Sequence, residues 1–325
     1  MSYADNATSI VADIGGTNTR VALAQGPRIL HETVRRYANA DQPDLTSVLR
    51  RFMAETGVAD CSGACVAAAG PVRDGVARMT NLDWTIDAEA VAAATGAETV
   101  AVLNDLQAQG FGLDHLAPGS LRTVIAGTEQ ARPGASRLVI GVGTGFNAAP
   151  VHEGPGGRIV AASECGHAGL PVREDADLRL VRFVERAHGF AGVEDALSGR
   201  GLERIYAWAS EERGGRDQLS AAGIMAAMAT GDDPVATEAG RTFVRLLGQV
   251  AGNLALIHLP FGGIYLIGGV ARAFEPHFGA FGLAAAFHDK GRFSDFMRAF
   301  SVHVIEDDFA ALAGCAAYLA GRAPG

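Results

Sequence analysis

Apolar and polar residues follow two patterns along the chain: short apolar runs typical of strands, and longer segments with apolar residues at helical spacing. Two segments share one form, in which an apolar run leads into a glycine and threonine turn and a second β-compatible run follows. They cover residues 9–24 and 137–151. Each predicts a hairpin, whereas a dinucleotide-binding Rossmann loop would continue into a helix.

Further strands and helices are predicted around these hairpins. Buried strands are expected at residues 64–69, 99–103 and 263–269. Helices are expected at residues 43–56, 86–95, 236–258 and 309–319. Because strands and helices are mixed without a low-complexity linker, the pattern predicts an α/β fold whose domain boundaries are hinges within continuous structure.

Composition narrows the function classes. The 325 residues suffice for about two domains, and a formal net charge of −9 argues against nucleic-acid binding through the overall field. The segment 1–9 lacks the pattern of a signal peptide, and no apolar run reaches the roughly 18 residues of a membrane span, so we expect a cytoplasmic protein. Disulfides or a zinc site are not expected from four scattered cysteines, Cys61, Cys65, Cys165 and Cys315.

Lys290 is the only lysine among 27 lysine and arginine residues. This excludes a G-x-x-x-x-G-K-[ST] phosphate loop and the strand lysine of protein kinases. A phosphate site in this chain therefore has to use backbone amides, hydroxyl groups, arginine and a metal ion. For Lys290 itself, a structural ion pair and a contact near a nucleotide are both open.

The two hairpin turns are the candidates for such a site. A glycine-rich turn exposes several backbone N–H groups that can bind phosphate oxygens, and a threonine hydroxyl adds a donor. The segments supply Asp13, Gly15, Gly16, Thr17 and Asn18, and then Gly143, Thr144 and Gly145. Asp13 is expected to hold Mg²⁺ through water. Two such turns, one in each half, indicate two domains that grip the phosphates of one nucleotide.

Polar residues near other predicted elements could carry the chemistry. Asn104 and Asp105 follow a buried strand, where an aspartate can accept the proton of an attacking hydroxyl, although such a pair more often only caps the next helix. Glu164 and His167 could bind a metal or hydrogen-bond sugar hydroxyls. Glu194 has the alternative role of an acid in the first turn of a helix.

Taken together, eight segments between residues 9 and about 320 resemble bacterial ATP-dependent glucokinases, in the same order. They are Asp13–Arg20, Thr80–Asn81 with Trp84, Asn104–Asp105, Gly143–Gly145, Glu164 with Gly166–His167, Ala196–Gly199, Gly263–Gly269 and Phe287–Phe293. The resemblance implies a two-domain α/β fold of the actin-like (ribonuclease H-like) ATPase or hexokinase type, with a deep cleft, and a homodimer. Residues 1–106 with 307–325 would form the small domain, and residues 107–306 the large one.

The resemblance also implies a reaction and its residues. Asp105 would be the base that takes the proton from the 6-hydroxyl of glucose, with ATP as donor and Mg²⁺ as cofactor. The implied sugar ligands are Asn104, Asp105, Glu164, His167 and Glu194. The two hairpin turns would bind the phosphates, and Gly268 and Gly269 would lie near the adenosine.

Three departures from the family pattern leave the substrates open. Ala12 stands where glycine is common, Phe146 and Asn147 stand where smaller residues are expected, and Cys165 replaces a glycine in the implied sugar site. A kinase for another hexose, or one with another phosphoryl donor, is therefore an alternative. A sugar-binding regulator without catalysis is a further one, although the zinc-bearing cysteine motif of the related repressors and sugar kinases is missing.

Overall fold

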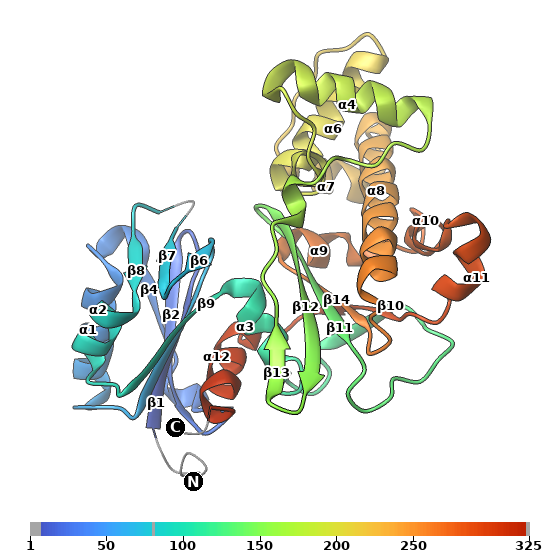
Figure 1. Ribbon diagram of the computed structural model, residues 1–325. Coiled ribbons are helices and arrows are strands. Elements are labelled where there is room, and N and C mark those ends of the chain that lie inside the picture. The colour runs from blue at the N-terminus through green and yellow to red at the C-terminus, as the bar shows by residue number, and fades with distance from the viewer. Residues whose placement is uncertain (1–7, 80–81, 323–325) are drawn as a thin grey trace. The chain divides into compact units, whose positions relative to one another are not determined.

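The computed structural model describes residues 8–79 and 82–322. Thr80 and Asn81, which belong to the family resemblance, lie outside the described residues. The chain divides into two compact units, the first made of residues 1–120, 155–162 and 307–325 and the second of residues 121–154 and 163–306 (Figure 1). The first unit thus reaches beyond the boundary at residue 106 expected from the sequence, because helix α3 and strand β13 pack within it.

The elements of the first unit begin with the predicted hairpin. They are β1 (Thr8–Ile14), β2 (Asn18–Gln25), β3 (Arg28–Ile29), η1 (His31–Thr33), β4 (Arg35–Ala38), η2 (Asn39–Asp41), α1 (Leu45–Thr56), β5 (Gly63–Ala68), β6 (Val72–Arg73), β7 (Val76–Arg78), β8 (Thr85–Asp87), α2 (Ala88–Thr95), β9 (Thr99–Asn104), α3 (Asp105–Gly112), β13 (Gly157–Val160) and α12 (Ala310–Ala320).

The main sheet of the first unit has the order β3-β2-β1-β5-β9, with β4 also paired to β2. Since side chains alternate between the faces of a strand, Ile10 and Ala12 pack on one face with α1 and α2. Val11 and Ala22 face the opposite way, toward Ala108 of α3 and the alanine-rich helix α12. The two cores lie on opposite faces of this sheet (Figure 1).

Two glycines let α3 and α12 approach closely. A Cβ on Gly112 would overlap the carbonyl oxygen of Ala310, and a Cβ on Gly314 would overlap that of Ala108. Interiors are close-packed, so neither position tolerates even one methyl group without a shift. The position of α3, whose first residue is Asp105, therefore depends on this contact.

Local capping explains where the predicted helices begin. The Asp44 carboxylate accepts a hydrogen bond from the amide of Ser47 at 2.7 Å, and Gly57 ends α1 in the left-handed region with φ 71°. The helix expected at 86–95 begins only at Ala88, because Asp87 is its N-cap and accepts from the amide of Glu89. The preceding residues form β8 instead.

The second unit combines a sheet with most of the helices. Its elements are β10 (Leu121–Ile125), β11 (Arg137–Val142), β12 (Phe146–Gly154), η3 (Cys165–His167), α4 (Asp175–His188), α5 (Val193–Ala196), α6 (Gly199–Glu212), α7 (Ala221–Thr230), α8 (Pro234–His258), β14 (Ile264–Ile267), α9 (Gly269–Phe274), η4 (Glu275–His277), α10 (Leu283–His288), η5 (Gly291–Phe293), α11 (Ser294–Met297) and β15 (Val302–Ile305).

Strands β10, β15, β14, β11 and β12 lie in this order in the second unit, and β11 with β12 is the second predicted hairpin. The long helix α8 packs along the core, where Phe243 stacks on Phe274 of α9 with ring centroids 4.5 Å apart. Figure 1 shows α8 beside α6, α7 and α10. Among the described residues, no helix has the length and apolar character needed to cross a membrane.

Candidate functional site

Parallel pairing brings two candidate residues to one edge of the first sheet. β1, β5 and β9 are parallel neighbours, with Asp13 opposite Ala67 and Asn104 opposite Ala68. Strands lie about 4.8 Å apart, so the ends of β1 and β9 are about 10 Å apart. Asp13 points to the sheet face that α3 covers, since it shares its face with Val11. The first unit therefore gathers the Asp13 hairpin and Asp105 at the carboxyl edge of one sheet.

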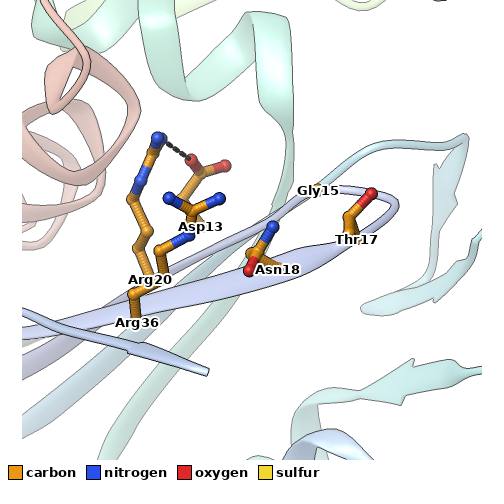
Figure 2. A pocket seen from close by; sticks show the side chains of 6 residues that line it. All are labelled: Asp13, Gly15, Thr17, Asn18, Arg20 and Arg36. Atoms are coloured by element: carbon orange, nitrogen blue, oxygen red, sulfur yellow. Dashed lines mark ion pairs between the residues drawn. The ribbon is translucent and has the colours of Figure 1, made fainter. Parts of the chain in front are cut away.

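A pocket of about 230 Å³ opens at the first turn. It is lined by Asp13, Gly15, Thr17, Asn18, Arg20 and Arg36 (Figure 2). The turn closes through the Gly15 amide, which donates to the carbonyl of Asn18 at 3.0 Å. The Asn39 side chain donates to the Gly15 carbonyl at 2.8 Å, so the backbone of the turn is held in place from η2.

Three charged residues form one row across the sheet in this pocket. Arg20 is the register partner of Asp13 on β2, and Arg36 is the partner of Arg20 on β4. The Arg20 guanidinium lies 3.6 Å from the Asp13 carboxylate (Figure 2). It also donates to the carbonyl of Asp308. Two guanidinium groups and the turn amides give the pocket the character of an anion site.

The Asp13 side chain is 20% exposed and could hold a metal ion. Burial raises the pKa of Asp13, and the Arg20 charge opposes this shift. Mg²⁺ prefers oxygen ligands and is commonly bound by one or two carboxylates together with substrate phosphates. Among the described residues, no group of three His, Cys, Asp or Glu side chains is arranged as a metal site. A single carboxylate beside an anion pocket fits a metal ion whose other ligands are phosphate oxygens and water.

Asn104 and Asp105 sit at the junction of β9 and α3. Asn104 caps the helix, as its alternative interpretation expected: its Oδ1 accepts from the Leu106 amide at 3.0 Å, and Gln107 completes a capping box. Its Nδ2 also donates to the carbonyl of Gly70. The Asp105 carboxylate accepts from the Leu106 amide at 2.9 Å. The positive end of α3 favours the ionised form of Asp105, and only the ionised form can accept a proton.

In the second unit, the second turn and the glycine pair at 268–269 share a sheet edge. β11 and β14 are parallel, with Gly141 opposite Ile267, so both turns follow strands that end together. Gly268 has φ 100°, and a Cβ there would overlap the carbonyl of Val142. The Gly199 amide donates to the carbonyl of Gly143 at 2.9 Å. These contacts join the second turn, Gly268 and the start of α6 into one backbone surface.

Glu194 is packed directly against the second turn. It lies in the first turn of the short helix α5, as its structural interpretation expected. Its Oε2 accepts from the Phe146 amide at 2.9 Å, and a Cβ on Gly145 would overlap the same oxygen. The glycine therefore leaves the space that this carboxylate fills.

Glu164 and His167 lie at η3, and both are exposed. Asn147 of β12 holds this segment: its Nδ2 donates to Glu164 Oε2 at 3.3 Å, and its Oδ1 accepts from the Cys165 amide at 3.2 Å. The second unit thus brings Glu164, His167 and Glu194 to elements that adjoin β12.

Sequence reasoning gave no role in the site to Arg36 or Asn147. Arg36 lies opposite Arg20 only because β4 pairs with β2, although β3 stands between these strands in the chain, so no local sequence pattern reveals its place. Asn147 was noted only as a departure from the family pattern. Its contacts with residues 163–165 join segments 16 to 18 positions apart, which no local pattern reveals.

Comparison with known proteins identifies the family of this chain. The sequence profile of the Glucokinase family matches residues 10–322. The chain belongs to the Glucokinase family. A glucokinase of Marinobacter nauticus is 33% identical over 309 residues, which cover 95% of this chain and 96% of the relative.

Solved structures share the fold of this chain. The crystal structure of a glucokinase from an Antarctic psychrotroph superposes with a TM-score of 0.86 at 28% identity and covers 97% of this chain and 99% of that one. A glucokinase from Streptomyces griseus of the ROK family, crystallised with glucose and AMPPNP, shares the fold with a TM-score of 0.58 at 21% identity, over 95% of this chain and 98% of that one. The expected α/β fold of the actin-like hexokinase type is confirmed. The family match and the glucokinase relatives show that the chain is a sugar kinase of the glucokinase type.

The structure gives Lys290 a structural contact. Its Nζ donates to the carbonyl of Gln249 at 3.0 Å and to Asn253 Oδ1 at 2.8 Å, both on α8. Burial lowers the pKa of Lys290. We expect Lys290→Met to lower the free energy of unfolding by about 1–2 kcal/mol, because two hydrogen bonds from a charged donor are lost. Denaturant unfolding measures this.

Lys290→Arg is the matched variant, since it keeps a charged donor. We expect the Michaelis constant for the phosphoryl donor to be unchanged in both variants. If Lys290→Met raised that constant severalfold with unchanged stability, the nucleotide role would hold instead.

Proposed function

We propose that this family member is a glucokinase that transfers the γ-phosphoryl group of ATP to the 6-hydroxyl of glucose, which gives glucose 6-phosphate and ADP. The observation that carries the proposal lies in the first unit, where the Asp13 hairpin at the end of β1 and Asp105, directly after β9, lie at the same edge of one sheet with only β5 between the two strands. A phosphate-binding turn and a base at one edge are the parts that phosphoryl transfer to a hydroxyl needs. A homodimer, which the family resemblance implies, and a cytoplasmic location, which the sequence pattern predicts, belong to the same proposal.

The donor half of the reaction rests on the two turns. In the first, the amides and the Thr17 hydroxyl would bind phosphate oxygens beside Arg20. In the second, the backbone of residues 143–145 would do the same, and Gly268 and Gly269 would lie near the adenosine. Asp13 would hold Mg²⁺ through water, and the ion, when bound, supplies charge neutralisation at the phosphates.

The acceptor half rests on Asp105 and the polar residues near β12. The Asp105 carboxylate would accept the proton of the 6-hydroxyl as its oxygen attacks the γ-phosphorus in line. Asn104, Glu164, His167 and Glu194 would hydrogen-bond the other hydroxyls. A sugar with a missing or inverted hydroxyl leaves one of these groups unpaired, which costs about 1–3 kcal/mol. Such a set therefore suits selection among hexoses.

An ADP-release assay over a panel of hexoses and donors tests the proposal. We expect kcat/KM to be highest for glucose with ATP and to require Mg²⁺. A higher value for mannose, fructose or an amino sugar would assign another hexose, and a higher value with another donor would replace ATP. If no sugar elicited ADP release although sugars bound, the chain would be a regulator without catalysis.

Arg36 gives a prediction specific to the donor. Its guanidinium lines the pocket at the first turn, so Arg36→Ser should weaken the binding of a polyphosphate (Figure 2). A charge-assisted hydrogen bond at an exposed site contributes about 1 kcal/mol, so we expect KM for ATP to rise about fivefold. KM for glucose should be unchanged.

Arg35→Ser is the matched control. Arg35 is adjacent on β4 and donates instead to the carbonyls of Glu32 and Val34. If both substitutions changed KM for ATP equally, the effect would reflect the net charge of the strand and the role assigned to Arg36 would be refuted.

A further inference from the structure

Two of the three departures from the family pattern contact each other in the second unit. Asn147 lies on β12, directly after the second turn, and Cys165 lies 18 residues later in η3. The Asn147 Oδ1 accepts from the Cys165 amide at 3.2 Å and lies 3.5 Å from the Cys165 sulfur. The departures therefore form one local arrangement rather than two unrelated changes.

The Asn147 amide has a single orientation that satisfies its neighbours. On its nitrogen side lie two acceptors, the carbonyl of Ser163 and the Glu164 carboxylate, and Nδ2 donates to both. On its oxygen side lie two backbone donors, the amides of Ala148 at 2.8 Å and Cys165 at 3.2 Å. An amide side chain offers two N–H donors and one acceptor oxygen, which is what this position requires.

The Cys165 side chain supports this arrangement from the interior. It is half-buried and packs against the hydrophobic core of the second unit. Burial raises the pKa of the Cys165 thiol, so the sulfur stays protonated at neutral pH. A Cβ on the next residue, Gly166, would overlap the carbonyl of Phe146. The residues before and after Cys165 therefore both contact β12: Glu164 through Asn147, and Gly166 through the carbonyl of Phe146.

We propose that Asn147 is a positioning residue for Glu164, and that it strengthens the binding of the sugar through that carboxylate. The inference rests on the proposed function, in which Glu164 binds a sugar hydroxyl. Glu164 is exposed, so without a partner its side chain would sample several rotamers. The hydrogen bond from Asn147 Nδ2 selects one of them and leaves the second carboxylate oxygen to accept from the sugar.

Asn147→Asp tests this with almost no change in shape. It keeps the oxygen that accepts from Ala148 and Cys165, removes both donated hydrogen bonds, and places a second carboxylate beside Glu164. Because like charges repel at this distance, Glu164 should turn away. We expect the dissociation constant of glucose, measured by calorimetry, and KM for glucose to rise at least tenfold, while KM for ATP stays within twofold. Asn253→Asp on α8 makes the same chemical change elsewhere in the second unit and should alter neither constant.

The deciding comparison is a double-mutant cycle with Glu164→Gln. In that background an aspartate at position 147 meets an amide instead of a carboxylate, so Asn147→Asp should then change the glucose dissociation constant less than threefold. Equal effects of Asn147→Asp in both backgrounds would overturn the inference, because Asn147 would then not act through Glu164. If the Asn147→Asp protein does not fold, Asn147→Ser replaces it in the cycle, because serine removes the amide donors without adding a charge. In the Glu164→Gln background, Asn147→Ser should likewise have little effect on the glucose dissociation constant.

Measurements of glucose binding and phosphorylation by the wild-type protein distinguish a failure of the proposed function from a failure of the inference about Asn147. If it binds glucose without phosphorylating it, the proposed function fails, while the binding cycle still tests Asn147. If it phosphorylates glucose and the cycle is additive, only the inference about Asn147 fails.

Discussion

Replacing Asp105 by asparagine is expected to lower kcat for glucose phosphorylation about 1000-fold, while the dissociation constant of glucose changes less than about threefold. Asparagine has the shape of aspartate, and its Oδ1 can still accept from the Leu106 amide that holds Asp105 at 2.9 Å. The start of α3 should therefore stay intact. What is lost is the ability to take a proton from the attacking hydroxyl. Steady-state kinetics and calorimetric glucose binding measure the two quantities.

Asp60→Asn is the matched control for this substitution, since Asp60 is an exposed aspartate of the same unit outside the candidate site. It should retain full activity. An Asp105→Asn protein with a near-normal kcat would show that another group accepts the proton. A loss of glucose binding as large as the loss of kcat would instead make Asp105 a binding residue.

Gly314→Ala is expected to have the largest effect on stability. The added methyl group would overlap the carbonyl of Ala108, so α12 and α3 would have to move apart. Overpacking of a tight contact costs about 1–3 kcal/mol and more where backbone is the obstacle. We expect the melting temperature to fall by about 5–10 °C. Thermal unfolding followed by circular dichroism measures the change.

The same substitution should also lower kcat, because α3 begins at Asp105. Gly156→Ala is the control in the same unit: a Cβ there meets nothing within 4 Å, and its stability should match that of the wild type. If the Gly314→Ala protein had the melting temperature of the wild type, the contact between α3 and α12 would not be as tight as their packing indicates. If its melting temperature fell while kcat stayed unchanged, the position of α3 would not matter for the reaction.

Structural features that depend only on residues close together in the chain could be predicted from the sequence. Each hairpin turn lies between two β-compatible runs within fifteen residues or so, and both hairpins are present as expected. Asp44 and Gly57 mark the ends of α1 because capping acts over three or four positions. The strand ends that carry Asp13 and Asp105 follow from the same local reasoning, and the parallel register then places them at one edge.

What the sequence could not supply depends on contacts between distant segments. The residues before Ala88 have helical character, yet they form β8, because they pair with β7 and Asp87 caps the helix that follows. Asn147 meets Glu164 only after η3 has folded against β12. Likewise, the glycines of α3 and α12 lie some 200 residues apart, and only the packed structure shows why each lacks a side chain.

The most direct test of the central claim is where the γ-phosphoryl group goes. The protein is incubated with Mg²⁺, [γ-³²P]ATP and either glucose or 6-deoxyglucose, and the labelled products are separated. We predict label in glucose 6-phosphate with glucose and no labelled sugar with 6-deoxyglucose. Label in a different sugar phosphate, or equal labelling of 6-deoxyglucose, would contradict the assignment of this chain as a kinase of the glucose 6-hydroxyl.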